Sequence, residues 1–372
     1  MTTVGIFGAG QLGRMLALAG YPLGLRFRFF DPQASPPAAA VGEHVRAAYT
    51  DRQAVARFAR SVDVVTFEFE DAPLAALRVA AGHAPVYPTP AALAALQDRW
   101  DERQLLRRLG LPIAPSAPAE TAAEMAAGLD RIGLPAVIKR RRAGYDGRGQ
   151  RLVRHRGAAR RAWRALGAAP AIVEALQPFH RELSIIGVRG RDGALRIYPL
   201  AENQHRDGIL RRSLAPAPAT TVQQATARRY VRRLLEALDY VGVLTVELFE
   251  VDGRLLVNEL APRVHNSGHW TIEGAETSQF ENHLRAVLGL PLGDPSPRGA
   301  AAMVNLIGSP PALPTVLGMD GVHLHLYDKP ARPHRKLGHV TVHAADRRRL
   351  APRLAAVERL IGGASARRTA HP

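Results

Sequence analysis

The sequence predicts a protein of several domains with α/β and α+β architecture. Short apolar runs typical of strands alternate with helical stretches from the N-terminus onward, which indicates a parallel sheet covered by helices. The chain has 372 residues, of which 47% are hydrophobic, and this is enough for two or three domains with cores of their own.

The composition excludes several classes of protein. The sequence has no cysteine, which excludes disulfide scaffolds, thiolate metal sites and cysteine nucleophiles. No run reaches the roughly 18 apolar residues that a membrane-spanning helix needs, and the N-terminus shows no pattern typical of a signal peptide. We therefore expect a cytoplasmic protein that does not associate with membranes.

The formal net charge of +17 is compatible with nucleic-acid binding. The basic residues are spread along the chain without interleaved aromatic residues, so we interpret them as an arginine-rich solvated surface that favours anionic substrates. Among the 50 basic residues the only lysines are Lys139, Lys329 and Lys336. These positions are candidates for a compact ammonium group that a planar guanidinium cannot replace.

Three domains are expected, at residues 1–97, 98–297 and 298–372. The last is predicted to be small and β-rich, to follow a linker at residues 293–297 and to end in loosely held residues. In the first domain strands alternate with helices, and the strands are predicted at residues 4–7, 26–30 and 63–68.

The middle domain is expected to follow a long helix. Thr89 is a capping residue and Pro90 suits the first helical position, so a helix is predicted from there to about Leu109. A lobe of strands and helices is expected over about residues 118–182.

A glycine-rich turn follows the first strand. The pattern Gly8-x-Gly10-x-x-Gly13 offers backbone N–H groups and a helix N-terminus to a phosphate. With Asp31 after the second strand it matches a dinucleotide fingerprint, but another phosphate ligand or a purely structural turn also fits the pattern.

Two further segments indicate nucleotide binding. Lys139 ends a strand before the loop Gly144–Gln150, whose three glycines predict a flap that can close over phosphates. An exposed hairpin tip with a solvated lysine is the alternative. Another strand continues into Glu174–Gln177, with Glu182 shortly after. Such an exit segment can bind an adenine edge and a ribose, although surface carboxylates fit equally well.

Two carboxylates, Glu247 and Glu259, lie in apolar strands on either side of an Asp-Gly turn. A two-residue loop would place Glu247 opposite Asn258 and turn Glu259 to the other face. A three-residue loop with Gly253 in the left-handed conformation and a bulge brings both carboxylates to one face, and we favour it. Both carboxylates and the Asn258 amide oxygen then suit a magnesium–phosphate site, which an ordinary amphipathic hairpin does not explain.

Two polar segments complete the set. Residues 261–271 include Arg263, His265 and Asn266, and these donors suit an anionic or polyhydroxyl ligand, while the histidine spacing fits no zinc site. Residues 327–339 hold the last two lysines. A second phosphate contact and a solvated basic hairpin are both compatible with that segment.

Together these motifs resemble the ATP-grasp ligases. Within that class, residues 10–14, 144–150, 258–271 and 327–329 are similar to the N5-carboxyaminoimidazole ribonucleotide synthetase family of purine biosynthesis. The similarity extends from Val4 to about Val342, and the segment around His265 is its most discriminating part.

This resemblance implies an ATP-grasp fold with a Rossmann-like pre-ATP-grasp domain and a small β-rich C-terminal domain, assembled as a homodimer. It implies a ligase that uses ATP and bicarbonate to carboxylate 5-aminoimidazole ribonucleotide and releases ADP and phosphate. The carboxylating species would be carboxyphosphate, or CO2 released from it. Mg2+ is the implied metal, with Mn2+ as a substitute.

The resemblance also implies site residues. Its ATP contacts fall on Arg99, Lys139, Gly144, Tyr145, Asp146, Gly147, Arg148, Gly149, Gln150, Glu174, Ala175, Leu176, Gln177, Glu182, His205, Asn258 and Glu259. Its metal ligands fall on Glu247 and Glu259. Its contacts to the ribonucleotide fall on Gln11, Leu12, Glu70, Lys329, Arg335 and Lys336. Its catalytic residues fall on Tyr145, Asp146, Arg148, Arg263, His265, Asn266 and Lys329.

Three other functions account for part of the sequence. A formate-dependent glycinamide ribonucleotide transformylase would release ADP with formate rather than bicarbonate. A dinucleotide oxidoreductase would be stabilised by NAD(P) and not by ATP. A nucleic-acid-binding protein would show steeply salt-dependent binding to single or double strands, which we do not expect at physiological salt.

Overall fold

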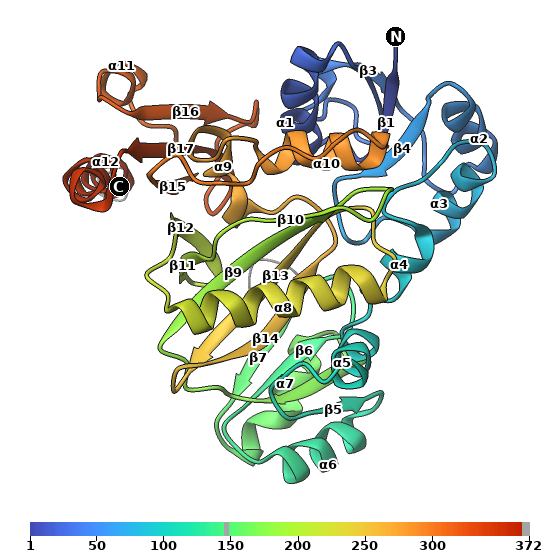
Figure 1. Ribbon diagram of the computed structural model, residues 1–372. Coiled ribbons are helices and arrows are strands. Elements are labelled where there is room, and N and C mark those ends of the chain that lie inside the picture. The colour runs from blue at the N-terminus through green and yellow to red at the C-terminus, as the bar shows by residue number, and fades with distance from the viewer. Residues whose placement is uncertain (145–148, 367–372) are drawn as a thin grey trace.

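The computed structural model describes residues 1–144 and 149–366, and side chains up to residue 361. The predicted flap residues Tyr145, Asp146, Gly147 and Arg148, and the predicted loose end from residue 367, lie outside the described residues. The strands form three sheets. In Figure 1 the N-terminal sheet lies at the top, the largest sheet runs behind α8, and a small lobe lies below.

The N-terminal sheet is parallel, with the strand order β3-β2-β1-β4. Its strands are β1 (Thr3–Phe7), β2 (Arg26–Phe30), β3 (Glu43–Val45) and β4 (Val64–Phe67). The helices that accompany it are α1 (Gln11–Gly20), α2 (Arg52–Arg60) and α3 (Leu74–Ala81). Every residue of β4 is buried, as expected for a parallel strand covered on both faces. The predicted parallel α/β arrangement is confirmed.

The predicted long helix is wrong, because it divides into α4 (Pro90–Ala94) and α5 (Arg99–Arg108). Thr89 caps α4 as predicted. Asp98 then starts a new helix, since its carboxylate accepts a hydrogen bond of 2.9 Å from the Trp100 N–H.

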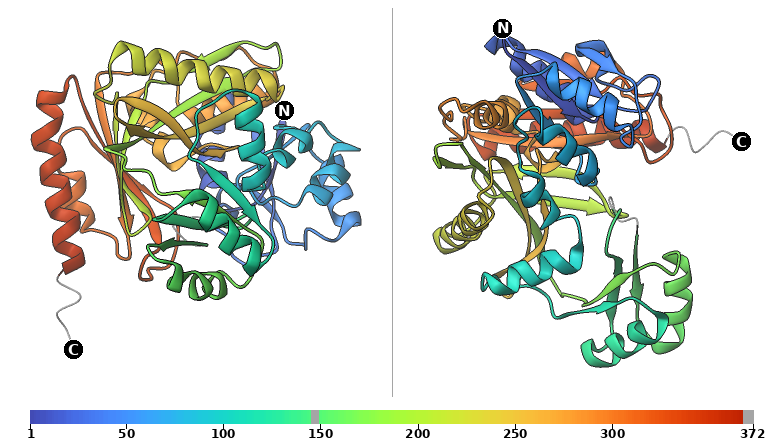
Figure 2. Two further views of the ribbon diagram at one scale, coloured as in Figure 1. Left: turned by 90° about the horizontal axis from the view of Figure 1, so that it is seen from below. Right: turned by 90° about the vertical axis from the view of Figure 1, so that its right-hand side faces the viewer.

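The lobe contains a four-stranded antiparallel sheet with the order β5-β8-β6-β7. Its strands are β5 (Ser116–Ala119), β6 (Ala136–Arg140), β7 (Gln150–Val153) and β8 (Ala171–Ala175). Its helices are α6 (Ala122–Ile132) and α7 (Ala159–Ala165). Both helices bury apolar side chains against the sheet. Figure 2 shows the lobe projecting from the rest of the molecule.

In the described part of the chain the largest sheet has nine strands, in the order β14-β13-β9-β11-β12-β15-β17-β16, with β10 beside β9. Its strands are β9 (Arg181–Arg189), β10 (Leu195–Ile197), β11 (Ala201–Arg206), β12 (Ile209–Ala215), β13 (Gly242–Val251), β14 (Arg254–Ala261), β15 (Ala300–Ile307), β16 (Val322–Leu326) and β17 (Lys336–Ala344). The helices of this part are α8 (Thr221–Ala237), α9 (Thr271–Gly274), α10 (Gln279–Leu288), α11 (Leu313–Leu317) and α12 (Arg347–Ala366).

The strands after residue 298 do not form a sheet of their own. β15 pairs with β12, so the C-terminal strands extend the sheet of the middle segment. Helix α10 lies beside α1 in Figure 1, and Leu284 packs near Gly20 between them. Distant parts of the sequence therefore meet around the β9–β13 region. No helix in residues 1–144 and 149–366 is long and apolar enough to cross a membrane.

Candidate functional site

The hairpin β13–β14 brings the two predicted carboxylates to one face. Its loop is the two-residue turn Asp252-Gly253, with φ of 49° and 75°, so the predicted three-residue loop is wrong. A bulge at Asn258 corrects the register, because Leu248 pairs with Val257 whereas Glu247 pairs with Glu259. Glu247 and Glu259 thus pair directly with each other. They share one face, as predicted, but the bulge and not a longer loop brings them there.

Two cations, one from helix α5 and one from strand β6, contact this hairpin. Arg99 Nη1 lies 2.6 Å from Glu259 Oε2. Lys139 Nζ lies 2.5 Å from Glu174 Oε2 and 3.3 Å from Asn258 Oδ1. The small lobe and the large sheet therefore contact each other through Lys139, the last residue but one of β6, at the position predicted for phosphate binding.

Arg103 lies beneath these groups, and sequence reasoning missed it. Its side chain is 1% exposed, and its Nε lies 2.6 Å from Glu174 Oε1. It also bonds Glu102 at 3.1 Å and donates to the Asn258 carbonyl. Burial alone would raise the pKa of Glu174, but Lys139 and Arg103 lower it to about 2. An arginine on a helix gives no signal in a chain with so many arginines.

Glu102 shows the opposite behaviour, since burial raises its pKa to about 7 even beside Arg103.

A histidine and a carboxylate form a further pair on strands β9 and β11. His205 Nδ1 lies 2.5 Å from Glu182 Oε2. Burial would lower the pKa of His205, but the hydrogen bond to Glu182 raises it above its ordinary value. Glu182 and His205, on neighbouring strands, thus form a pair of donor and acceptor groups near Glu247.

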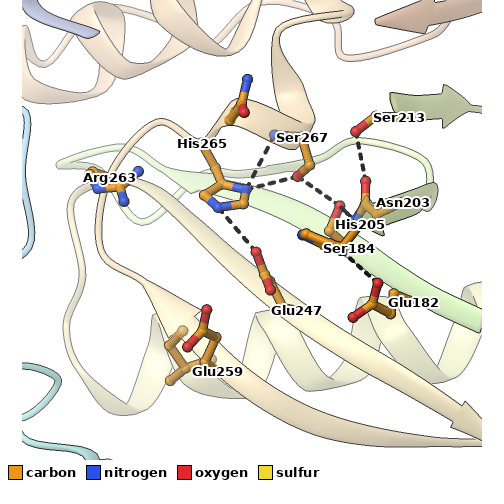
Figure 3. A network of polar contacts seen from close by, with 12 residues as sticks. Glu182, Ser184, Asn203, His205, Ser213, Glu247, Glu259, Arg263, His265 and Ser267 are labelled. Carbon is orange, nitrogen blue, oxygen red and sulfur yellow. Dashed lines mark hydrogen bonds and ion pairs between the residues drawn. The ribbon is translucent and has the colours of Figure 1, made fainter. Parts of the chain in front are cut away.

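The loop after β14 holds His265 against the hairpin (Figure 3). His265 Nε2 lies 3.1 Å from Glu247 Oε1. Gln279 fixes the loop, because its amide accepts from the His265 N–H at 3.0 Å and donates to the His265 carbonyl at 2.7 Å. The Asn266 side chain is engaged by Asn305, which donates to its oxygen at 2.7 Å. Asn305 lies far along the chain, and no sequence signal links the two.

The glycine-rich turn of the first domain binds the protein's own carboxylates. Gly13 N–H donates to Glu68 Oε2 at 2.7 Å, and Gly10 N–H also donates to Glu68. Ala9 N–H donates to Asp31 Oδ2 at 3.1 Å. These N–H groups are those that a dinucleotide pyrophosphate would need, so the geometry favours the structural interpretation of the turn.

Residues of the first domain meet those of the last two predicted segments. Glu70 Oε2 lies 2.5 Å from Arg263 Nε. Burial would raise the pKa of Glu70, but the Arg263 guanidinium lowers it to about 2. Gln11 accepts a hydrogen bond from Lys329. Leu12, by contrast, is buried and packs in the core.

A cavity of about 550 Å³ opens beside Lys329. It is lined by Arg14, Pro310, Leu326, Asp328, Lys329, Ala331 and Leu337. Arg335 and Lys336 are close by in sequence, and Arg335 donates to the Pro330 carbonyl at 3.4 Å. Arg14 was not among the predicted residues, although it follows the glycine pattern directly.

Known protein families match most of the chain. Residues 1–97 match the ribonucleotide synthetase preATP-grasp domain, residues 104–280 the ATP-grasp domain, and residues 301–353 the phosphoribosylaminoimidazole carboxylase C-terminal domain. The fold, with its lysine-bearing lobe and paired carboxylates, thus defines an ATP-grasp protein, and the predicted fold class is confirmed.

Comparison with individual proteins shows which family within the ATP-grasp class the chain resembles. The N5-carboxyaminoimidazole ribonucleotide synthase of Pseudomonas aeruginosa is 49% identical over 358 residues, which cover 96% of this chain and 99% of that protein. The crystal structure of the corresponding synthetase from Thermus thermophilus is 53% identical with a TM-score of 0.92, covering 96% of this chain and 98% of that chain. The Aspergillus clavatus synthase in complex with ADP and 5-aminoimidazole ribonucleotide is 32% identical with a TM-score of 0.90, covering 97% and 98%. The chain belongs to the N5-carboxyaminoimidazole ribonucleotide synthase family.

Proposed function

We propose that this protein carboxylates 5-aminoimidazole ribonucleotide with bicarbonate at the expense of ATP, as an ADP-forming ligase of purine biosynthesis. The observation that carries the proposal is the convergence of two sites. The cations and carboxylates around Lys139 and Glu259 suit ATP, and they adjoin the Glu70–Arg263 pair, which suits a second anionic, hydroxyl-bearing substrate. Family membership specifies that substrate.

The reaction balances in two steps. A bicarbonate oxygen attacks the γ-phosphorus of ATP, the bond to the β-γ bridging oxygen breaks, and ADP leaves with carboxyphosphate remaining. The exocyclic amine of the ribonucleotide then attacks the carboxyl carbon, directly or after release of CO2, and loses a proton while phosphate departs. Because carboxyphosphate is labile in water, the site must exclude solvent, which is the role that we assign to the flap Gly144–Gln150.

The protein's part is positioning and charge neutralisation. Arg99 and Lys139 would contact the phosphates of ATP, and Glu182 and His205 its ribose side. The segment Glu174–Gln177 would bind the adenine edge through its backbone. The Glu174 carboxylate itself has its two oxygens on Lys139 and Arg103, and this supports a role in placing the lysine.

Magnesium fits the hairpin. In the described residues no group of three or more acidic or histidine side chains is arranged to hold a metal ion. Mg2+ bound with a nucleotide needs only one or two carboxylates from the protein, since phosphate oxygens and water supply its other ligands. Glu247 and Glu259, opposite each other on one face, would supply these carboxylates. Mn2+ could take the place of Mg2+ there. Bound there, the metal would neutralise charge on the transferring phosphoryl group.

On the ribonucleotide side, Gln11, Glu70, Lys329, Arg335 and Lys336 would hold the substrate, with Leu12 contributing backbone only. Arg263, His265 and Asn266 would lie at the bicarbonate or the intermediate. The homodimer rests on the resemblance alone and the cytoplasmic location on the sequence alone, and both stay predictions.

The test is ADP release from ATP, Mg2+ and bicarbonate, with and without 5-aminoimidazole ribonucleotide, for the wild type and Glu259→Gln. Strong stimulation by the ribonucleotide that is lost in the variant is expected. ADP release that responds instead to formate and glycinamide ribonucleotide would replace the substrate assignment, and absence of ATP turnover would refute the proposal altogether.

A further inference from the structure

A chain of buried polar side chains leads from the large sheet to His265 (Figure 3). It crosses three adjacent strands, β12, β11 and β9, through Ser213, Asn203 and Ser184, and reaches Ser267 in the loop after β14. These four side chains are at most 6% exposed. They are thus too deep to contact substrate, and the end of the chain that reaches the site is the contact of Ser267 with His265.

The hydrogen bonds of this chain have a consistent direction. Ser213 Oγ donates to Asn203 Oδ1 over 2.7 Å, and the Asn203 amide donates to Ser184 Oγ over 3.0 Å. Ser184 then donates its own proton to Ser267 Oγ over 2.8 Å. Because Ser267 Oγ accepts from Ser184, its own proton is available for a hydrogen bond to His265 Nδ1, which lies 2.9 Å away.

The backbone fixes the end of the chain independently. The Ser267 N–H lies 3.3 Å from the same Nδ1, and a backbone amide can only donate. His265 Nδ1 is therefore an acceptor of both donors, and the ring carries its proton on Nε2. That N–H points at Glu247 Oε1, 3.1 Å away, on the face of the hairpin where the two carboxylates meet.

We propose that Ser267, and Ser184 behind it, are positioning residues that hold His265 in the tautomer with its proton on Nε2. His265 then serves the reaction as a hydrogen-bond donor and not as an acceptor. This inference rests on the proposed function, in which His265 lies at the bicarbonate. Bicarbonate, carboxyphosphate and the nearby carboxylate are all anionic, so a donor stabilises them where a nitrogen lone pair would repel them.

The tautomer can be read directly by NMR on the full-length protein with 15N-labelled histidine. The ring signals of His265 are assigned by their loss in His265→Gln. We expect an unprotonated Nδ1 and a protonated Nε2. A ring with its proton on Nδ1 would overturn the proposal without bearing on whether the protein carboxylates the ribonucleotide.

Kinetics supply the second test. Ser267→Ala removes the hydroxyl donor to the ring and is expected to lower kcat about 10- to 100-fold, the usual cost of losing an orienting partner, with the KM for ATP unchanged. Ser184→Ala should cause a smaller loss of kcat, because Ser267 keeps its own bond to the ring. Thr341→Val is the matched control, since in the described part of the chain the buried Thr341 hydroxyl has no hydrogen-bond partner.

The outcomes separate the two proposals. Wild-type protein without ribonucleotide-stimulated ADP release would refute the proposed function. Active wild type, with Ser267→Ala folded and equal to Thr341→Val in kcat, would refute the positioning role. If Ser267→Ala does not fold, Ser184→Ala decides: its kcat supports the role if it falls below that of Thr341→Val and refutes it if the two are equal.

Discussion

Replacing Glu174 by glutamine tests the buried charge network beneath the proposed ATP site. The substitution keeps the size of a side chain that is 4% exposed and removes its negative charge. Arg103 and Lys139 then lose a carboxylate whose oxygens lie 2.6 and 2.5 Å away. Arg103 is 1% exposed, so water cannot take the place of that carboxylate.

The magnitude follows from the pKa of Glu174. Burial raises this pKa, but Lys139 and Arg103 outweigh it and bring the value from 4.5 down to about 2. The difference between these two pKa values corresponds to about 3 kcal/mol of stability at neutral pH. Removing one partner of a buried ion pair costs about 3–5 kcal/mol, so the two approaches agree. We expect Glu174→Gln to lower the free energy of unfolding by about 3 kcal/mol and to raise the KM for ATP.

The same pKa sets the pH dependence. A carboxylate whose pKa is lowered in the folded state stabilises that state fully at pH values above its pKa in the unfolded chain, here 4.5. This contribution to stability is lost as the pH falls toward the folded-state pKa of about 2. The stability difference between wild type and Glu174→Gln should therefore be constant from about pH 8 to pH 5 and shrink below pH 4.5.

Urea unfolding of both proteins across this pH range measures the difference. Glu43→Gln is the matched control, because it removes the same charge from a pair with Arg28 in which Glu43 is 60% exposed. Such a surface pair contributes about 0–1 kcal/mol. If Glu174→Gln costs no more than this control at pH 7, or if its cost grows on acidification, the reasoning is refuted.

Three further predictions concern the turn, the second substrate and the metal. Gly8→Ala should destabilise by about 1–3 kcal/mol in urea unfolding, because Gly8 has a φ of 93° and a Cβ there would lie 2.6 Å from Glu68. Gly24→Ala, at a φ of 70° with open space around it, should cost less, and equal losses would contradict this account. Arg263 Nε lies 2.5 Å from Glu70, which is proposed to hold the ribonucleotide. Arg263→Lys should therefore displace Glu70 and raise the KM for 5-aminoimidazole ribonucleotide about tenfold, roughly 1.4 kcal/mol, with the KM for ATP unchanged. A raised KM for ATP with an unchanged KM for the ribonucleotide would contradict this prediction. EDTA should abolish ADP release and excess Mg2+ restore it, and ADP release that survives EDTA would exclude the proposed metal role.

The features that the sequence predicts best are local. The strands and the Thr89 cap follow from residue patterns within a few positions. The shared face of Glu247 and Glu259 is predicted from the wrong loop, because the bulge at Asn258 that produces it depends on a two-residue Asp-Gly turn together with the pairing of two long strands.

Long-range features could not be read from the pattern. Arg103 is one arginine among many, and only the fold buries it between Glu102 and Glu174. Asn305 meets Asn266 because β15 pairs with β12, a contact between segments far apart in the chain. The contacts of such residues can be inferred only when the order of the strands in the sheet is known.

Activation of bicarbonate by phosphorylation is tested most directly by following the transfer of oxygen. With 18O-labelled bicarbonate and ribonucleotide, the attacking bicarbonate oxygen should end in the released phosphate, because the carbon–oxygen bond of carboxyphosphate breaks in the second step. Single labelled oxygens in the phosphate, formed by the wild type and not by Glu259→Gln, are the predicted result. Turnover that releases unlabelled phosphate would contradict the account, because the γ-phosphoryl group would then have passed to water or to the ribonucleotide.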